Sequence, residues 1–189
     1  VMGAENGSVF AWGWNDHGQV GDGSVTNRLA PVQLGVSGVV SVSCGYAHSL
    51  ALLSDGTVLS WGENLMGELG DGGAIGSLPE RHTPAPVAGL TGVVGIAASD
   101  YNHSVAVKSD GTVWSWGKNF SGQLGDGTST DTSVPVKAVG VTGAVRVSVS
   151  TSGSTFAILS NGQVWGWGGD LGATPARVPF LDGASAVEG

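Results

Sequence analysis

The sequence SDGTVLSWGENLMGELGDGG spans residues 54–73, and a closely similar stretch, SDGTVWSWGKNFSGQLGDGT, spans residues 109–128. A third version, ENGSVFAWGWNDHGQVGDGS, spans residues 5–24. Trp-Gly pairs recur at intervals of 49, 55 and 51 residues, and their tryptophans are Trp12, Trp61, Trp116 and Trp167. Such self-similarity at a period of about fifty residues indicates a repeat protein, and the repeat unit decides the fold.

The composition of the repeats is typical of β-strands joined by tight turns. Apolar runs are short, rich in Val and interrupted by Gly. Of the 189 residues, 34 are Gly and only 12% are charged, which suits many turns and disfavours long helices. No long stretch follows the 3.6-residue periodicity of a helix. We therefore expect an all-β fold.

One unit of the repeat, residues 31–62, shows how the strands are divided. Its Asp55-Gly56 pair indicates a tight hairpin turn, because Gly readily adopts a positive φ. Further turn signals separate the other apolar stretches. We expect four short strands in this unit, at residues 31–34, 39–44, 48–53 and 57–61.

Both faces of the last strand in this unit are apolar. Val58 points to one face, whereas Leu59 and Trp61 point to the other, because side chains alternate along a strand. Such a sheet must be covered on both sides, and the neighbouring repeats can provide the cover. Four-stranded sheets packed face to face around an axis form a β-propeller. A β-solenoid is the main alternative, but its coils would be shorter and less interrupted.

Several motifs recur together at fixed offsets: GYAHSLAL at residues 45–52, Trp61-Gly62 with Asn64, GELGDG at residues 67–72, and Pro86-Val87. This combination resembles the RCC1 (regulator of chromosome condensation) repeat, in its bacterial form. The resemblance covers essentially the whole chain and implies a propeller, usually of seven blades. The last copy departs from the pattern, because Ser154-Thr155 replaces His-Ser and only residues 169–172 remain of the glycine-rich loop.

The repeat units make the chain a single module, residues 1–189, with about four repeats. Three complete blades are flanked by two half repeats, which gives the divisions 1–13, 31–62, 86–117, 135–168 and 178–189. The two half repeats are complementary, so the chain could close as a strained ring of four blades. Two chains could instead share blades, or the chain could be part of a longer propeller. We favour a homo-oligomer or a longer parent chain over self-closure.

The charge balance limits the classes of partner. Seven Lys and Arg against fifteen Asp and Glu give a net charge of −8. This argues against binding of nucleic acid, whose phosphates require clustered cations. No apolar run is long enough to span a membrane. The Ser, Thr and Gly-rich, Lys-poor composition looks like that of an exported bacterial protein, and we expect an extracellular or cell-surface location.

Two histidines invite a catalytic interpretation, because His48 and His103 each precede a Ser. Adjacent residues of a strand point to opposite faces, however, so each His-Ser pair cannot form a nucleophile and base. We expect no catalytic residues, and we expect each His to bond the backbone of the next blade.

Three acidic residues are weak candidates for metal binding: Asp22, Asp71 and Asp126 occupy equivalent Gly-Asp-Gly loops. Calcium prefers six to eight oxygen ligands, and each loop offers a single Asp. We expect each Asp to bond the backbone of its own turn, and we expect no metal or other cofactor.

Binding residues are expected where the repeats differ from one another, since large side chains on the loops of a rigid scaffold form binding surfaces. Tyr46 and Tyr101 occupy equivalent turns, so we expect them side by side in an aromatic patch. The alternative is that these side chains pack under neighbouring loops. The candidates are Tyr46, Tyr101, Asn102, Trp14, His17, Leu65, Met66 and Phe120.

The function expected from these features is that of a non-enzymatic module. It would bind a protein partner through rim loops, or its own copies through blade edges. Among relatives, the resemblance implies nucleotide exchange on a small GTPase with chromatin binding, β-lactamase inhibition, and bacterial surface or effector roles. The acidity of the chain and its lack of a basic tail argue against the chromatin role. The alternative is a hydrolase or lyase with its site in the central channel, but the segments expected there are apolar or small.

Overall fold

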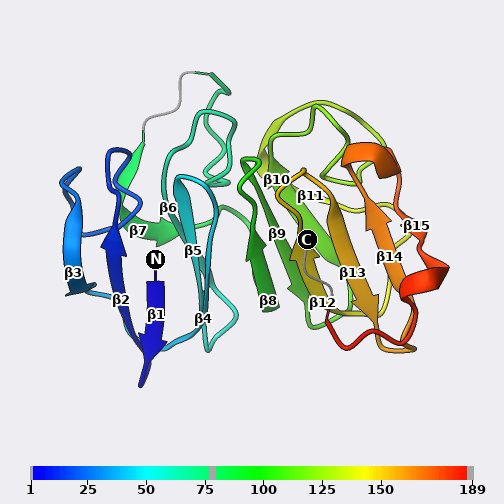
Figure 1. Cartoon of the computed structure of the whole chain (residues 1–189), viewed down its shortest axis with the longest axis horizontal. Helices are drawn as coiled ribbons and strands as arrows, with labels where there is room; N and C mark the ends of the chain where they lie inside the picture. Colours follow the sequence, from blue (N-terminus) through cyan, green and yellow to red (C-terminus); the bar gives the residue numbers. More distant parts are fainter. Residues whose placement is uncertain (1, 77–79, 187–189) are drawn as a thin grey trace.

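A computed structural model describes residues 2–76 and 80–186 of the chain (Figure 1). Within these residues the regular elements are β-strands and two 3-10 helices. They are β1 (Met2–Glu5), β2 (Ser8–Gly13), β3 (Arg28–Gln33), β4 (Val39–Cys44), β5 (His48–Leu53), β6 (Val58–Gly62), β7 (Arg81–Pro86), β8 (Val93–Ala98), β9 (His103–Lys108), β10 (Val113–Gly117), β11 (Thr132–Lys137), β12 (Ala144–Val149), β13 (Thr155–Leu159), β14 (Val164–Trp167), η1 (Gly169–Leu171), β15 (Ala176–Arg177) and η2 (Pro179–Leu181).

The strands form four antiparallel sheets that follow one another along the chain. The first sheet has three strands, β1-β2-β3, and the other three are β4–β7, β8–β11 and β12–β15. The first strands of these three sheets lie next to one another at the inner side, β4 against β8 and β8 against β12. Figure 1 shows the sheets side by side, as successive blades. The predicted all-β fold with four-stranded propeller blades is confirmed.

The sheets begin at a different point of the repeat from the predicted units 31–62, 86–117 and 135–168. The strand expected at the start of the first unit is β3, which pairs with β2 of the preceding sheet. Likewise β7 pairs with β6, so the last strand of each sheet comes after the long loop. The period of a repeat does not reveal where each sheet begins, because the same sequence can be divided into units at any point. The backbone pairing of the strands decides where each sheet begins.

The core of the fold lies between neighbouring sheets. The Trp of each Trp-Gly pair in β6, β10 and β14 is fully buried against the preceding sheet. Each indole Nε1 donates a hydrogen bond to a carbonyl oxygen in the loop of that preceding sheet. The donors Trp61, Trp116 and Trp167 reach the carbonyls of Gln19, Glu68 and Gln123, at 2.9, 2.8 and 3.0 Å. Packing of an aromatic side chain and a specific hydrogen bond therefore fix how consecutive sheets stack.

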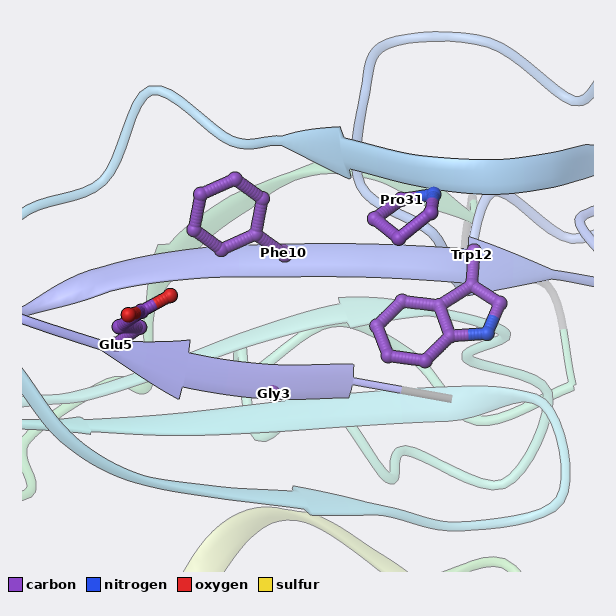
Figure 2. Close-up of a pocket in the computed structure, with 5 residues that line it drawn as sticks. All are labelled: Gly3, Glu5, Phe10, Trp12 and Pro31. Carbon is purple, nitrogen blue, oxygen red and sulfur yellow. The ribbon is translucent and has the colours of Figure 1, made fainter.

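The first sheet presents the equivalent face without a preceding sheet of the chain to cover it. Figure 2 shows a pocket on this face, lined by Gly3, Glu5, Phe10, Trp12 and Pro31. Its volume is about 540 Å³. Phe10 corresponds to Leu59 of the second sheet, which is buried in the core. This apolar sheet face is thus of the kind that the other sheets bury.

The two predicted half repeats have different outcomes. Residues 1–13 were expected to match two consecutive strands, and within the described part they form the hairpin β1-β2. Residues 178–189 were expected to match two strands as well. The described part, up to residue 186, instead contains the 3-10 helix η2, and residues 187–189 lie outside the described residues. Pro179 begins this helix, and a proline has no amide hydrogen to donate to a sheet.

No helix long and apolar enough to cross a membrane is found among the described residues.

Candidate protein-binding surface

The loops that differ between repeats gather at one end of the sheets. Residues 14–27 follow β2, residues 63–76 belong to the loop that follows β6, and residues 118–131 follow β10. The turns 45–47 and 99–102 lead into β5 and β9 at the same end, because these strands run antiparallel to β6 and β10. We call these five segments the rim face.

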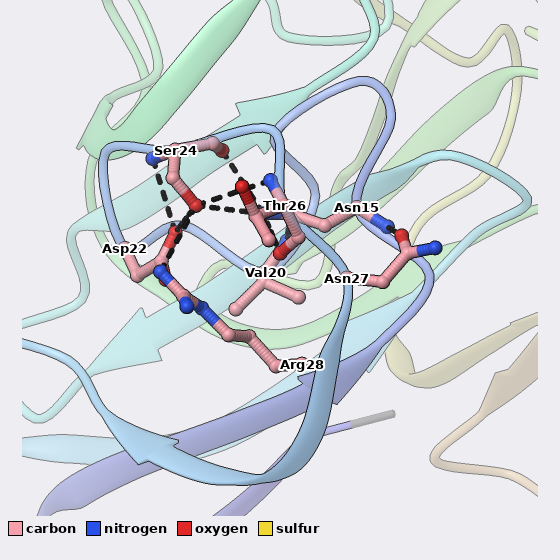
Figure 3. A network of polar contacts seen from close by, with 7 residues as sticks. All are labelled: Asn15, Val20, Asp22, Ser24, Thr26, Asn27 and Arg28. Carbon is pink, nitrogen blue, oxygen red and sulfur yellow. Dashed lines mark hydrogen bonds and ion pairs between the residues drawn. The ribbon is translucent and has the colours of Figure 1, made fainter.

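A buried asparagine organises the first rim loop (Figure 3). Asn15 is fully buried, and its Oδ1 accepts a hydrogen bond from the amide of Val20 at 2.8 Å. Its Nδ2 donates to the carbonyl oxygens of Ser24 and Thr26, at 2.9 and 3.0 Å. One side chain thus ties together both halves of a loop that has no regular secondary structure.

The same arrangement recurs in the next two loops. Asn64 and Asn119 are fully buried, and their Oδ1 atoms accept from the amides of Leu69 and Leu124 at 3.1 and 3.0 Å. No role was predicted for these asparagines from the sequence, although Asn64 belongs to a recurring motif. Their signal was visible, however, because each stands three residues after the Trp of a Trp-Gly pair. A rigid loop of this kind is a suitable support for binding side chains.

The aspartates of the Gly-Asp-Gly loops are engaged in their own turns. Each Oδ1 accepts a hydrogen bond from the amide two residues further on, as expected from the sequence. Asp22 also bonds Arg28 through Oδ2 at 2.5 Å, and Asp71 bonds Arg81 at 3.3 Å. Asp126 accepts from the Asn119 side chain at 3.2 Å. No cluster of three or more metal-binding side chains occurs among residues 2–76 and 80–186.

The two histidines bond side chains of the next sheet and not its backbone, which corrects the predicted partner. His48 Nε2 lies 3.0 Å from Ser104 Oγ, and His103 Nε2 lies 3.0 Å from Thr155 Oγ1. Ser104 in turn donates to the carbonyl of Glu68. Because that hydroxyl hydrogen is used, the His48 Nε2 carries the hydrogen of the first bond. Burial lowers the pKa of His48 to about 4, and burial lowers that of His103 to about 3. Both rings are therefore neutral structural links.

Two exposed aromatic rings meet on the rim face between the first and second sheets. The rings of Trp14 and Tyr46 contact edge to face, with 5.7 Å between centroids. Tyr46 is 63% exposed and Trp14 is 41% exposed. The ring of His17 also contacts Trp14 edge to face, with 5.3 Å between centroids, and its Nδ1 lies 2.5 Å from Glu80 Oε1. Three predicted binding residues are thus brought together.

Tyr101 lies apart from this group, so the predicted pairing of Tyr46 with Tyr101 is wrong. Its ring packs on Gly153 of the fourth sheet, where an added Cβ would come within 2.7 Å of the Tyr101 ring. The amine of Lys118 lies 3.8 Å from the centroid of the same ring. No ring contact joins the two tyrosines within the described part of the chain.

A buried carboxyl lies under the rim face between the second and third sheets. Glu68 is fully buried, and its Oε2 accepts from the amide of Met66 at 2.7 Å. The Asn102 side chain donates from one Nδ2 atom to both Glu68 Oε1 and Glu63 Oε2. Burial, with the neighbouring Glu63 carboxylate, raises the pKa of Glu68 to about 7. Asn102, a predicted binding residue, therefore acts as a link between sheets.

The remaining predicted binding residues differ in exposure. Phe120 is 78% exposed and Leu65 is 48% exposed, whereas Met66 is half-buried. Leu65 and Phe120 occupy equivalent places in successive loops, because each stands four residues after the Trp of a Trp-Gly pair. Both side chains are exposed and free to contact a partner.

The exposed residues of the inner strands β4, β8 and β12 are mostly apolar. Their exposed side chains include Val40, Val94 and Val145. Among the residues of β4, β8 and β12, the titratable groups are Cys44 and Arg146.

The motifs, the sheet topology and the stacking of the sheets all match one family. The regulator of chromosome condensation (RCC1) repeat matches residues 6–52, 55–107 and 110–159. The chain belongs to the RCC1 repeat family. This confirms the resemblance found in the sequence.

Individual relatives of this RCC1-repeat chain extend the comparison. The ultraviolet-B receptor UVR8 of Arabidopsis thaliana is 33% identical over 175 residues, which cover 87% of this chain and 39% of UVR8. The mitochondrial RCC1 domain-containing protein RUG3 of the same plant is 30% identical, covering 94% of this chain and 44% of RUG3. The chain therefore spans less than half the length of these relatives.

Solved structures agree with this assignment. Human WBSCR16 superimposes with a TM-score of 0.79 at 23% identity, over 93% of this chain and 49% of that one. Yeast RCC1 (Prp20), solved bound to Kap60, gives a TM-score of 0.78 at 25% identity, over 91% and 44%. Prp20p of Saccharomyces cerevisiae has also been studied for its binding to Gsp1p and histones. Relatives of this fold thus include proteins that bind other proteins.

Proposed function

We propose that this chain is a non-enzymatic module that binds a protein partner through its rim face. The observation that carries the proposal is the exposed Trp14–Tyr46 pair, with Phe120 exposed on an equivalent loop. Tyr and Trp dominate the energetics of many protein interfaces, because they bury a large area with few rotatable bonds. The loops that carry Trp14 and Phe120 are held by the fully buried Asn15 and Asn119, so ordering these loops on binding would cost little entropy.

The relatives support a binding role in general terms. Prp20p is described by its binding to Gsp1p and histones, and Prp20 has been solved bound to Kap60. The inner strands β4, β8 and β12, which would line a central channel, carry Cys44 and Arg146 as their titratable groups. A binding module is therefore favoured over a hydrolase or lyase.

The proposal is tested by selecting binders from a phage-displayed library of random peptides. We expect the selected peptides to bind the parent chain and to lose binding to a variant that combines Trp14→Ala, Tyr46→Ala and Phe120→Ala. Leu29→Ala, on a fully exposed side chain of the outer strand β3, is the matched control and should bind as the parent does. Peptides that bind the rim variant and the parent equally would place the binding surface elsewhere.

We also propose that the chain associates with a second copy through the open face of the first sheet. Supporting this is the equivalence between that face and the buried faces of the following sheets, which preceding sheets cover. The fourth sheet of a second copy would present the complementary face, with Phe156 and Ile158 on it. The interface would then repeat the packing that already joins sheets within the chain.

A further inference from the structure

The second and third sheets carry the same tyrosine in different surroundings. Tyr46 and Tyr101 each stand two residues before the first His of the following strand. In the third sheet, the Lys118 amine lies over the Tyr101 ring, 3.8 Å from its centroid. Lys118 directly follows the last residue of β10, and the residue that directly follows β6 is Glu63. An anion therefore stands in the second sheet where the third has the cation.

The exposure of the Tyr46 ring depends on which residue the next sheet presents to it. Tyr101 packs on Gly153, which has no side chain. The residue equivalent to Gly153 in the third sheet is Asn102, because Asn102 directly precedes His103 and Gly153 directly precedes Ser154, which replaces that His. The Asn102 side chain is held by Glu63 and Glu68, so Tyr46 cannot settle there as Tyr101 does. Tyr46 turns to Trp14 of the preceding loop instead.

The surroundings of this pair are acidic. Residues 14–27, 45–47 and 63–80 contain no Lys or Arg. The amide of Glu63 bonds the carbonyl of Ala47, which places Glu63 beside the turn that carries Tyr46. The Glu63 carboxylate is itself fixed by its hydrogen bond from Asn102. The acidic residues of these segments are Asp16, Asp22, Glu63, Glu68, Asp71 and Glu80. Three of them have basic partners, because Asp22 pairs with Arg28, Asp71 with Arg81 and Glu80 with His17.

We propose that Tyr46 and Trp14 form a binding site for a lysine or arginine side chain of a basic protein partner, with Glu63 as the counter-charge. The two exposed aromatic rings attract a cation through the ring quadrupole, and Glu63, whose backbone is hydrogen-bonded to the turn that carries Tyr46, adds an opposite charge. The Lys118–Tyr101 contact is the intramolecular example of the first interaction. This inference rests on the proposed binding function and specifies the chemistry of the partner.

The site can be tested with small probes that need no natural partner. The capped tripeptides acetyl-Gly-Arg-Gly-amide and acetyl-Gly-Lys-Gly-amide carry the cation, and the citrulline tripeptide is the neutral analogue of the arginine one. The indole N–H resonance of Trp14, assigned with Trp14→Phe, reports binding in nitrogen–proton NMR spectra. We expect saturable shifts with the two cationic peptides and weaker binding of the citrulline peptide. Equal binding of the citrulline peptide would overturn the proposal.

Matched variants separate the site from the overall negative charge. Tyr46→Leu should weaken binding of the cationic peptides about twofold to fivefold, the equivalent of ~0.5–1 kcal/mol for an exposed cation–π contact. Tyr101→Leu is the control and should leave the affinity unchanged, because Lys118 already covers that ring. If Tyr46→Leu binds as the parent does, the aromatic pair is not the site.

A charge reversal gives an independent test. Glu63→Lys should place an amine over Tyr46, as Lys118 lies over Tyr101, and block the external cation. Asp110→Lys makes the same change of charge in the hairpin turn at the opposite end of the sheets. We expect only the first to abolish the Trp14 shifts, and equal loss in both would mean that net charge alone attracts the probes. Library peptides that need the rim face but are unaffected by Glu63→Lys would refute this site and leave the proposed function standing.

Discussion

The carboxyl group of Glu68 meets the side-chain amide of Asn102 across the junction of the second and third sheets, with 3.0 Å between Oε1 and Nδ2. The equivalent positions in the neighbouring loops are Gln19 and Gln123, whose Nε2 atoms are buried and without a hydrogen-bond partner. The residues facing them, Ala47 and Gly153, have no side chain that could accept. Of these three junctions, the one between the second and third sheets is the one whose loop residue bonds a side chain of the next sheet. That loop residue, Glu68, is ionisable.

The stability of the chain should therefore depend on the protonation of Glu68. Its pKa is raised from 4.5 to about 7 by burial, so the folded state favours the neutral carboxyl. This contribution is fully present below pH 4.5 and is lost as the pH rises through about 7. This decrease in the free energy of unfolding with rising pH, up to about 3 kcal/mol, should be absent from Glu68→Gln. Urea unfolding of parent and variant over this pH range measures it.

The comparison with the variant also removes the effect of the buried histidines. Their pKa values are lowered to about 4 and about 3, so their contribution is present above 6.5 and is lost as the pH falls. The contribution of the histidines to the free energy of unfolding therefore increases with pH, opposite to that of Glu68. It is the same in the parent and in Glu68→Gln. Parallel pH profiles for the parent and Glu68→Gln would show that folding does not raise the pKa of Glu68.

Removing an inter-sheet tryptophan should destabilise the fold strongly. Trp61 and Trp116 are fully buried and donate hydrogen bonds to the preceding loop. Trp61→Ala or Trp116→Ala should cost roughly 3 to 5 kcal/mol, as is usual for an emptied aromatic site. Denaturant unfolding measures this, with Trp14→Ala as the exposed control. An unchanged midpoint for either buried site would contradict the packing of the sheets.

The sequence predicted the strands more accurately than their surroundings. Residues 39–44 and 48–53 were expected as strands and match β4 and β5 residue for residue. The blade phase was not predictable, because it depends on pairing between β2 and β3 across a long loop. The different positions of Tyr46 and Tyr101 were not predictable either. They depend on whether the next sheet presents Asn102 or Gly153, which only the stacking of sheets reveals.

The rim loops should depend on their buried asparagines more than on their aspartates. Asn119→Ala leaves the buried amide of Leu124 without its acceptor, which should cost about 1 to 3 kcal/mol. Asp126→Asn keeps an oxygen for the amide of Thr128 and should cost less. Thermal unfolding compares the two, and added calcium should leave the midpoint of the parent unchanged. A calcium-dependent rise that Asp126→Asn abolishes would make this loop a metal site.

Self-association should depend on the open face of the first sheet. Phe10 lines the pocket on that face (Figure 2). Its equivalent in the second sheet, Leu59, is buried between sheets. A charge introduced at Phe10 would have to be buried unpaired in the interface, so Phe10→Glu should shift the chain from dimer to monomer. Sedimentation velocity over a range of concentrations measures this shift. Leu29→Glu, on an exposed side chain of β3, is the control and should leave the dimer intact. A parent that stays monomeric at every concentration, or a Phe10→Glu variant that dimerises as the parent does, would show that this face does not join two copies.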